Sequence, residues 1–136
     1  MSIKKLLLII MLVIIAGIII FVAVYSFLGA KAADNEKTVI IPTGPKYQTN
    51  LKDCNSILLI SYQIEVKEDK KLLAQIEERN TEVRSRVLDI LRDKTREDIE
   101  GTRGKTNLET EILKYYHTLF GEDEILNVFI DDIVVQ

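Results

Sequence analysis

Histidine and cysteine, which build many catalytic and metal sites, are each present only once in this chain of 136 residues. A zinc site needs several His or Cys ligands at short spacings. The only candidates are His117 and Cys54, and neither has a second such ligand near it in the sequence. We therefore expect no metal site, and we expect His117 to be a partly exposed residue of a helix.

Motifs for nucleophilic catalysis and for phosphate binding are absent as well. No Gly-x-Ser-x-Gly elbow occurs, and the Gly-x-x-Gly-Lys run that starts at Gly101 lacks the glycine spacing of a phosphate loop. The acidic runs at residues 122–124 and 131–132 do not alternate around a glycine as calcium loops do, so they predict a solvated rim. We predict no enzymatic activity and no cofactor.

A single cysteine excludes an internal disulfide. Cys54 is either a small, buried apolar residue or a lone thiol that pairs between molecules. Because unpaired cysteines are among the most buried residues of proteins, burial is the preferred interpretation.

Basic side chains are outnumbered by acidic ones in most of the chain. Beyond residue 33 there are 15 basic and 21 acidic side chains, which gives that part a net charge of −6. A domain of that sign has no general affinity for phosphate backbones or anionic lipid head groups. Nucleic acid is therefore not an expected partner.

One long apolar run stands at the start of the chain. Residues 6–28 carry no charge, and as a helix these 23 residues extend about 35 Å, enough to cross the roughly 30 Å hydrocarbon core of a bilayer. A cleaved signal peptide is the alternative, because residues 29–33 are small enough for a peptidase. The apolar region of a signal peptide is usually only about 7–15 residues long, so we predict a retained transmembrane helix over residues 6–28.

Two lysines determine the expected orientation of that helix. Lys4 and Lys5 precede it, whereas the basic residues just after it are balanced by acidic ones. Since positive flanks stay in the cytoplasm, residues 1–5 are expected inside the cell and the rest of the chain beyond the helix outside it. Residues 29–46 hold both prolines and are expected to form a linker, and residues 47–136 an extracytoplasmic domain.

The pattern of the domain predicts an α+β fold in which amphipathic helices cover one face of a small sheet. Residues 58–66 alternate strictly between apolar and polar side chains, which is typical of a strand with one covered face. We expect them to form a hairpin with a strand at 47–51. The last strand, 125–136, is expected to bulge at its acidic pair, 131–132.

Helical periodicity fills the middle of the domain. Apolar residues at steps of three and four predict one long helix over 69–94, with Asp69 as its N-cap. Capping boxes at 95–98 and 106–109 predict a short helical turn and a further helix, and Gly121 is expected to end the latter.

Four stretches of the sequence, in this order, resemble the flagellar basal body-associated FliL family. They are residues 47–53, 58–66, 76–99 and 128–136, and they follow a single apolar span behind a Lys-Lys flank. The last stretch, VFIDDIVVQ, is the most specific, because it is similar to the terminal strand V-Y-F-T-(E/D)-F-V-(I/V)-Q of that family. The similarity extends along the whole chain.

The resemblance implies a bitopic inner-membrane protein of the bacterial flagellar basal body, with a fold similar to stomatin-type (SPFH) domains. It also implies homo-oligomeric rings around stator units of the MotA/MotB type, and a non-enzymatic role in supporting the stator during flagellar rotation, swarming and chemotaxis. The expected interaction face consists of Arg79, Glu82, Arg86, Phe129, Val134 and Val135. Alternatively, Arg79 and Arg86 only form intrahelical ion pairs with nearby glutamates.

Two functions of other classes remain open. The chain is alternatively a membrane-tethered extracytoplasmic binding or sensor domain unrelated to motility. A third reading, a secreted soluble effector, requires cleavage near Ala32.

Fractionation of cells tests the predicted anchor. After a wash of the membranes at alkaline pH, the full-length chain is expected in the pellet, because a helix of this length and hydropathy stays in the bilayer. A soluble chain that begins near Ala33 would contradict the anchor and support the secreted effector.

Overall fold

The structure of the protein is a computed structural model that describes residues 3–31 and 36–136. The chain divides into two compact units, Met1–Asn35 and Glu36–Gln136. Residues 32–35, which include part of the expected peptidase site and of the expected linker, lie outside the described residues.

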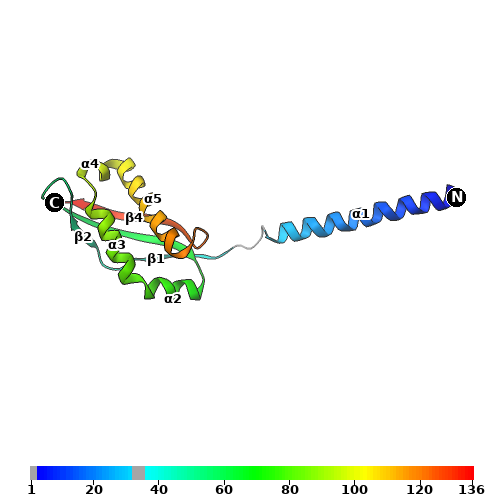
Figure 1. The fold of residues 1–136 in the computed structure, drawn as a ribbon, viewed down its shortest axis with the longest axis horizontal. Coiled ribbons are helices and arrows are strands. Elements are labelled where there is room, and N and C mark those ends of the chain that lie inside the picture. Colours follow the sequence, from blue (N-terminus) through cyan, green and yellow to red (C-terminus); the bar gives the residue numbers. More distant parts are fainter. Residues whose placement is uncertain (1–2, 32–35) are drawn as a thin grey trace. The chain divides into compact units, whose positions relative to one another are not determined.

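Helix α1, Ile3–Lys31, forms the first unit (Figure 1). Its segment Ile3–Tyr25 has a mean hydropathy of 3.5, and all of its side chains are exposed. An apolar helix exposed on every side needs apolar surroundings, and this one is long enough to cross a bilayer. The structure thus has the single N-terminal apolar helix that the sequence predicts.

Strand β3, Ile57–Lys67, is the centre of a small antiparallel sheet. Strand β4, Ile125–Val135, pairs with it over most of its length. Strands β1, Thr38–Pro42, and β2, Tyr47–Asn50, pair with opposite halves of β3 and therefore share its other edge. The predicted hairpin is confirmed, because Tyr47 lies opposite Ile60 and Asn50 opposite Ile57.

The structure differs from the expected linker at strand β1. Residues 38–42 alternate between exposed and half-buried side chains and pair with β3, although the sequence places them in a linker. The prolines suggested that assignment, but Pro42 is the last residue of β1, on the outer edge of the sheet, where no ladder bond is lost. Strand pairing on this edge is then interrupted at residues 43–46, where Gly44 has φ +91°, before β2 begins. We call these four residues the strand break.

The predicted bulge in β4 is confirmed at the acidic pair. Ser61 lies opposite Asp132 and Tyr62 opposite Ile130, so Asp131 has no partner across the ladder. The extra residue restores the alternation of the strand, as its sequence requires.

The predicted long helix is wrong in one respect, because it is two helices. Helix α2, Lys70–Glu78, ends at Arg79, and helix α3, Asn80–Arg92, starts immediately after it. Asp69 caps α2 by accepting a bond from the backbone N–H of Lys71, as predicted. The break is stabilised by Arg79, whose guanidinium donates to the carbonyl oxygen of Leu119 at 3.3 Å.

Helices α4, Arg96–Ile99, and α5, Gly101–Phe120, complete the domain (Figure 1). The capping box of Thr95 and Asp98 is present, and Gly121 ends α5, as predicted. The prediction that residues 106–109 open a helix is wrong, because α5 starts five residues earlier. The early start is possible because Gly104 leaves room for the backbone of α4.

The core lies between the helices and one face of the sheet. On β3 every second residue is buried, and α3 and α5 bury their apolar stripes against this face. The fully or almost fully buried apolar side chains of these elements are Leu58, Ile60, Tyr62, Ile64, Val66, Val83, Val87, Leu91, Leu108, Ile112 and Tyr116. The structure is therefore the mixed helix and sheet fold that the sequence predicts, with helices on one face.

Gly104 provides a test of the packing between α4 and α5. A Cβ atom at this position would lie 2.5 Å from the carbonyl carbon of Ile99. Replacing glycine by alanine inside a helix normally stabilises it by about 1 kcal/mol, whereas forced overpacking costs about 1–3 kcal/mol. We expect G104A to lower the melting temperature of the domain, followed by circular dichroism, while K114A at an exposed position of the same helix changes it little. A raised melting temperature for G104A would contradict the close packing.

Candidate functional site

The sheet has one covered face and one open face, and the open face is held by polar pairs. Lys46, directly before β2, has its Nζ 2.9 Å from Oδ2 of Asp132 on β4. This ion pair therefore spans β3, which lies between these two strands. Gln63 donates to Asp131, one residue before, at 3.1 Å. Both acids of the bulge therefore have partners on the sheet itself, as expected of a solvated rim.

A second polar group lies farther along the open face. Glu65 of β3 accepts from Asn127 of β4 at 2.7 Å and from Thr38 of β1 at 3.1 Å. Its carboxylate thus joins all three neighbouring strands. These pairs are exposed to solvent, so they direct the alignment of the strands more than they stabilise them.

Apolar side chains stand between these polar pairs. Phe129 lies opposite Gln63 and is 42% exposed, and Ile40 lies opposite Glu65 and is 53% exposed. Val134 lies opposite Leu59, and both are half-buried. The open face therefore carries both polar pairs and apolar side chains.

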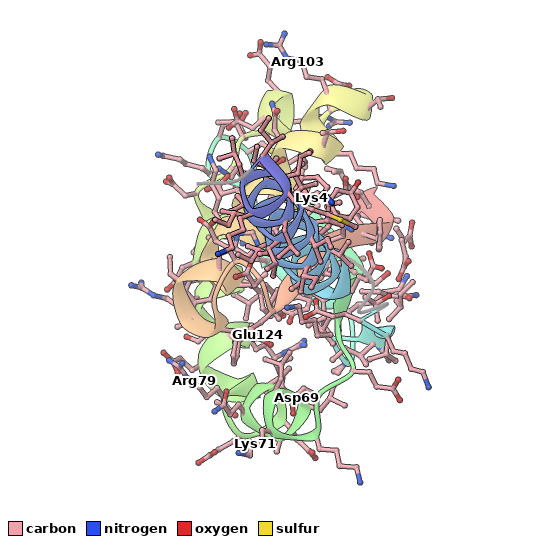
Figure 2. The ribbon with its side chains drawn as sticks, turned by 90° about the vertical axis from the view of Figure 1, so that its right-hand side faces the viewer. Lys4, Asp69, Lys71, Arg79, Arg103 and Glu124 are labelled. Atoms are coloured by element: carbon pink, nitrogen blue, oxygen red, sulfur yellow. The ribbon has the colours of Figure 1, made fainter. Side chains whose placement is uncertain are left out.

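The outer surface of the helices carries the other predicted residues. Arg79, labelled in Figure 2, is the first of these residues. It donates to both carboxylate oxygens of Glu82, at 2.8 and 3.0 Å, and its guanidinium lies 5.6 Å from the centre of the Phe120 ring. This hydrogen bond lowers the pKa of Glu82 and raises that of Arg79. Arg86 pairs more loosely with Asp89, at 3.7 Å.

The six residues of the predicted interaction face do not form one surface. Arg79, Glu82 and Arg86 belong to the helical layer, whereas Phe129 and Val134 point to the open side of the sheet. Val135 lies opposite the buried Leu58, on the helix side of the sheet, and lines a groove. Alternation along β4 separates Val134 from Val135, and the sequence alone does not show which side the helices cover.

Arg84 forms a site that sequence reasoning missed. Its guanidinium donates to the carbonyl oxygens of Pro45 and Lys46, at 2.9 and 3.0 Å, and lies 4.2 Å from the centre of the Tyr47 ring. The carbonyl groups freed by the strand break are thereby bound by a helix. The two prolines near Gly44 indicated a break, but nothing in the sequence assigned an arginine to it.

Three tyrosine hydroxyls meet inside the core. Tyr62 is in the middle, 3.1 Å from the hydroxyl of Tyr47 and 3.1 Å from that of Tyr116. Burial strongly raises the pKa of Tyr62, and the neighbouring hydroxyls add to the effect. Burial also raises the pKa of Tyr116. The hydroxyls of Tyr62 and Tyr116 therefore stay protonated. All three hydroxyls bind one another, which satisfies polar groups that would otherwise be costly to bury.

The two residues singled out for reactivity have structural surroundings. His117 is half-buried, and its Nε2 lies 2.8 Å from the carbonyl oxygen of Ile125, where α5 leads into β4. Cys54 is half-buried and packs against the core. Within residues 3–31 and 36–136, no group of three or more His, Cys, Asp or Glu side chains is arranged to hold a metal ion.

Two of the hollows on the surface of the domain lie beside elements described above. A groove of about 550 Å³ runs between β4 and the start of α5, and its lining includes Ile99, Lys105, Ile133 and Val135. A smaller pocket of about 370 Å³ lies between the strand break and the junction of α2 and α3.

Comparison with known proteins gives two similarities. The family described as "Flagellar basal body-associated protein FliL" matches residues 40–136. The chain is also 26% identical, over 108 residues, to a protein of Aquifex aeolicus (strain VF5) named "Flagellar protein FliL". That alignment covers 78% of this chain and 66% of the relative, so the chain spans just under two thirds of the relative's length.

Arg84 is expected to stabilise the domain by holding the strand break. Because R84A removes two bonds to backbone carbonyls and the contact with Tyr47, we expect it to lower the free energy of unfolding by about 1–3 kcal/mol. R84K should restore only part of this loss, since an ammonium group does not form the same fork. Urea unfolding followed by circular dichroism measures both. R86A is the matched control, and equal losses for R84A and R86A would contradict the special role of Arg84.

Proposed function

The chain belongs to the flagellar basal body-associated FliL family, and from this membership we propose that it is an inner-membrane component of the basal body that supports the stator. It is a structural flagellar protein in this proposal, and it acts by contact during flagellar rotation, swarming and chemotaxis. The family match over residues 40–136 is the observation that carries the proposal, since it covers nearly the entire folded domain.

The N-terminal helix supports a role at the membrane. It has the length and hydropathy of a single transmembrane span, and Lys4 and Lys5 precede its apolar part. With positive charge retained on the cytoplasmic side, the domain lies on the periplasmic side. There it reaches the parts of the motor that project beyond the bilayer.

Self-association is the second part of the proposal. A domain tied to a membrane moves in a plane, so the effective concentration of its copies is high and weak contacts are sufficient. Under this proposal, copies assemble as a ring beside stator proteins of the MotA/MotB type. The fold is expected to be similar to stomatin-type domains, which is consistent with helices on one face of a small sheet.

The available surfaces favour contact at several places. The outer helical surface with Arg79, Glu82 and Arg86 and the open face with Phe129 and Val134 lie on opposite sides of the sheet. A protein with two separate contact surfaces can bind its own copies on one and a different partner on the other. We assign the stator contact to the helical surface, where Arg86 is the most loosely paired charge of the three.

Deletion of the gene tests the proposal. We expect slower swimming in viscous medium and reduced swarming, because a stator that lacks support loses torque under load. Speed is measured by cell tracking and torque by the rotation of a bead on the flagellum.

Two rescue variants separate the role of the anchor from that of the domain. A chain in which an unrelated transmembrane span replaces residues 1–31 should restore motility, whereas residues 36–136 exported in soluble form should not. Normal torque in the deletion strain at every load would contradict the motor role and favour the alternative, a tethered binding or sensor domain unrelated to motility.

A further inference from the structure

The two outer edges of the sheet differ in how they are protected. The edge formed by β1 and β2 is interrupted by Pro42, Gly44 and Pro45, which blunt it against further strands. The other edge is β4, a strand of 11 residues that contains no proline and has a bulge at Asp131. Within residues 36–136, β3 is the only strand that pairs with it.

The backbone groups on the free edge of β4 follow from its register. Ile57 and Gln136 exchange both backbone hydrogen bonds, at 2.8 and 3.0 Å. In an antiparallel ladder such pairs alternate, so Asp132 and Val134 bond to β3. The N–H and C=O groups of Ile133 and Val135 therefore point away from β3.

One part of this edge is already covered by a helix. The backbone N–H of Ile130 donates to a carboxylate oxygen of Glu109, on α5, at 2.8 Å. Beyond this point α5 no longer binds the edge, and the groove beside Ile133 and Val135 begins. A gap of this kind, next to outward backbone groups, is suited to an added strand.

The charges along the groove favour a second copy of the same strand. Asp131 and Asp132 lie at one end. Arg96 lies at the other, because its backbone N–H donates to Asp53, in the loop that leads into Ile57 opposite Gln136. The lining also includes Glu100 and Lys105, so the groove carries charges of both signs. In an antiparallel pair of identical strands, Arg96 of each copy lies on the side of Asp131 and Asp132 of the other.

We propose that two copies of the chain pair antiparallel through the β4 edge, with Val134 of each copy opposite Val134 of the other. Ile133 of each then exchanges both backbone bonds with Val135 of the other, which satisfies all four outward groups on each edge. The sheets of the two copies become continuous. A contact of this kind is isologous and closes a pair, so other contacts of the domain remain free.

This proposed dimer rests on the proposed function in one respect: both require that the chain is anchored in the membrane and binds its own copies. Three residues on each side form a small contact, well below the usual size of a stable interface in solution. Confinement in the membrane compensates for this by raising the effective concentration. The full chain in its membrane is therefore the form in which the pair should be detected.

A cysteine at the two-fold centre tests the pair. In the C54A background, V134C places one thiol of each copy directly opposite the other. The two positions form a non-hydrogen-bonded pair, in which the Cα atoms are about 4.5 Å apart. At this distance a disulfide bond can form. Isolated membranes are treated with a mild oxidant, and the linked dimer of the full chain is measured on non-reducing gels. We expect several-fold more dimer for V134C than for the control F129C.

F129C is a matched control because Phe129 lies on the same face of the same strand. In the proposed register it is five residues from the centre, so the two thiols would be roughly 30 Å apart. A second variant, V135P, removes an outward N–H while the bonds to β3 remain. Added to V134C, it should reduce the dimer to the level of F129C.

Equal crosslinking of V134C and F129C, or unchanged crosslinking in the presence of V135P, would overturn the pair. Retention of each variant in the washed membranes and its melting temperature show that the domain is intact. Motility of the deletion strain tests the stator role separately, so the pair can fail while that role stands, and the reverse.

Discussion

Strand β3 is the element on which the rest of the domain depends. It has only two edges, and every other strand pairs with one of them. Its alternate residues are buried, so the helices pack on one face only. A shift of its register by one residue would move all five buried side chains to solvent, which fixes the alignment of the sheet. Because β4 occupies one edge along most of β3, β1 and β2 must share the other.

Most of the secondary structure could be predicted, because the spacing of apolar residues depends only on neighbouring positions in the sequence. The alternation of residues 58–66, the hairpin before it and the bulge at Asp131 all follow from the order of apolar and polar residues. The break at Arg79 could not be predicted, because it depends on a contact with Leu119, 40 residues away. The false start at Thr106 has a similar cause, since the close approach of α4 to Gly104 is tertiary.

Contact surfaces were harder to predict than the fold. Sequence patterns identify which residues of a strand share a face, but the helix-covered face becomes known only when the helices are placed. Phe129 and Val134 were therefore grouped with Arg79 and Glu82, although the sheet separates them. Val135 was among the expected contact residues, but the sequence alone could not show that it lies on a free strand edge, because a free edge is defined by backbone groups and by which strands are neighbours.

The bonds of Arg84 to the carbonyl oxygens of Pro45 and Lys46 have a mechanical consequence for a domain that is anchored to a membrane. Any pull transmitted along the chain from α1 first reaches Glu36 and Lys37, which bind Lys67 and the backbone N–H of Glu68. It then reaches Thr38, the first residue of an edge strand that pairs only with β3. Its five residue pairs would open one after another, starting opposite Lys67. Farther along, the chain is held by Thr43, whose hydroxyl donates to the carbonyl oxygen of Tyr62, and by Arg84, which binds the carbonyl groups of Pro45 and Lys46. Strand β1, whose Val39 and Ile41 pack against the core, is thus the first strand of the domain that tension along the chain would load.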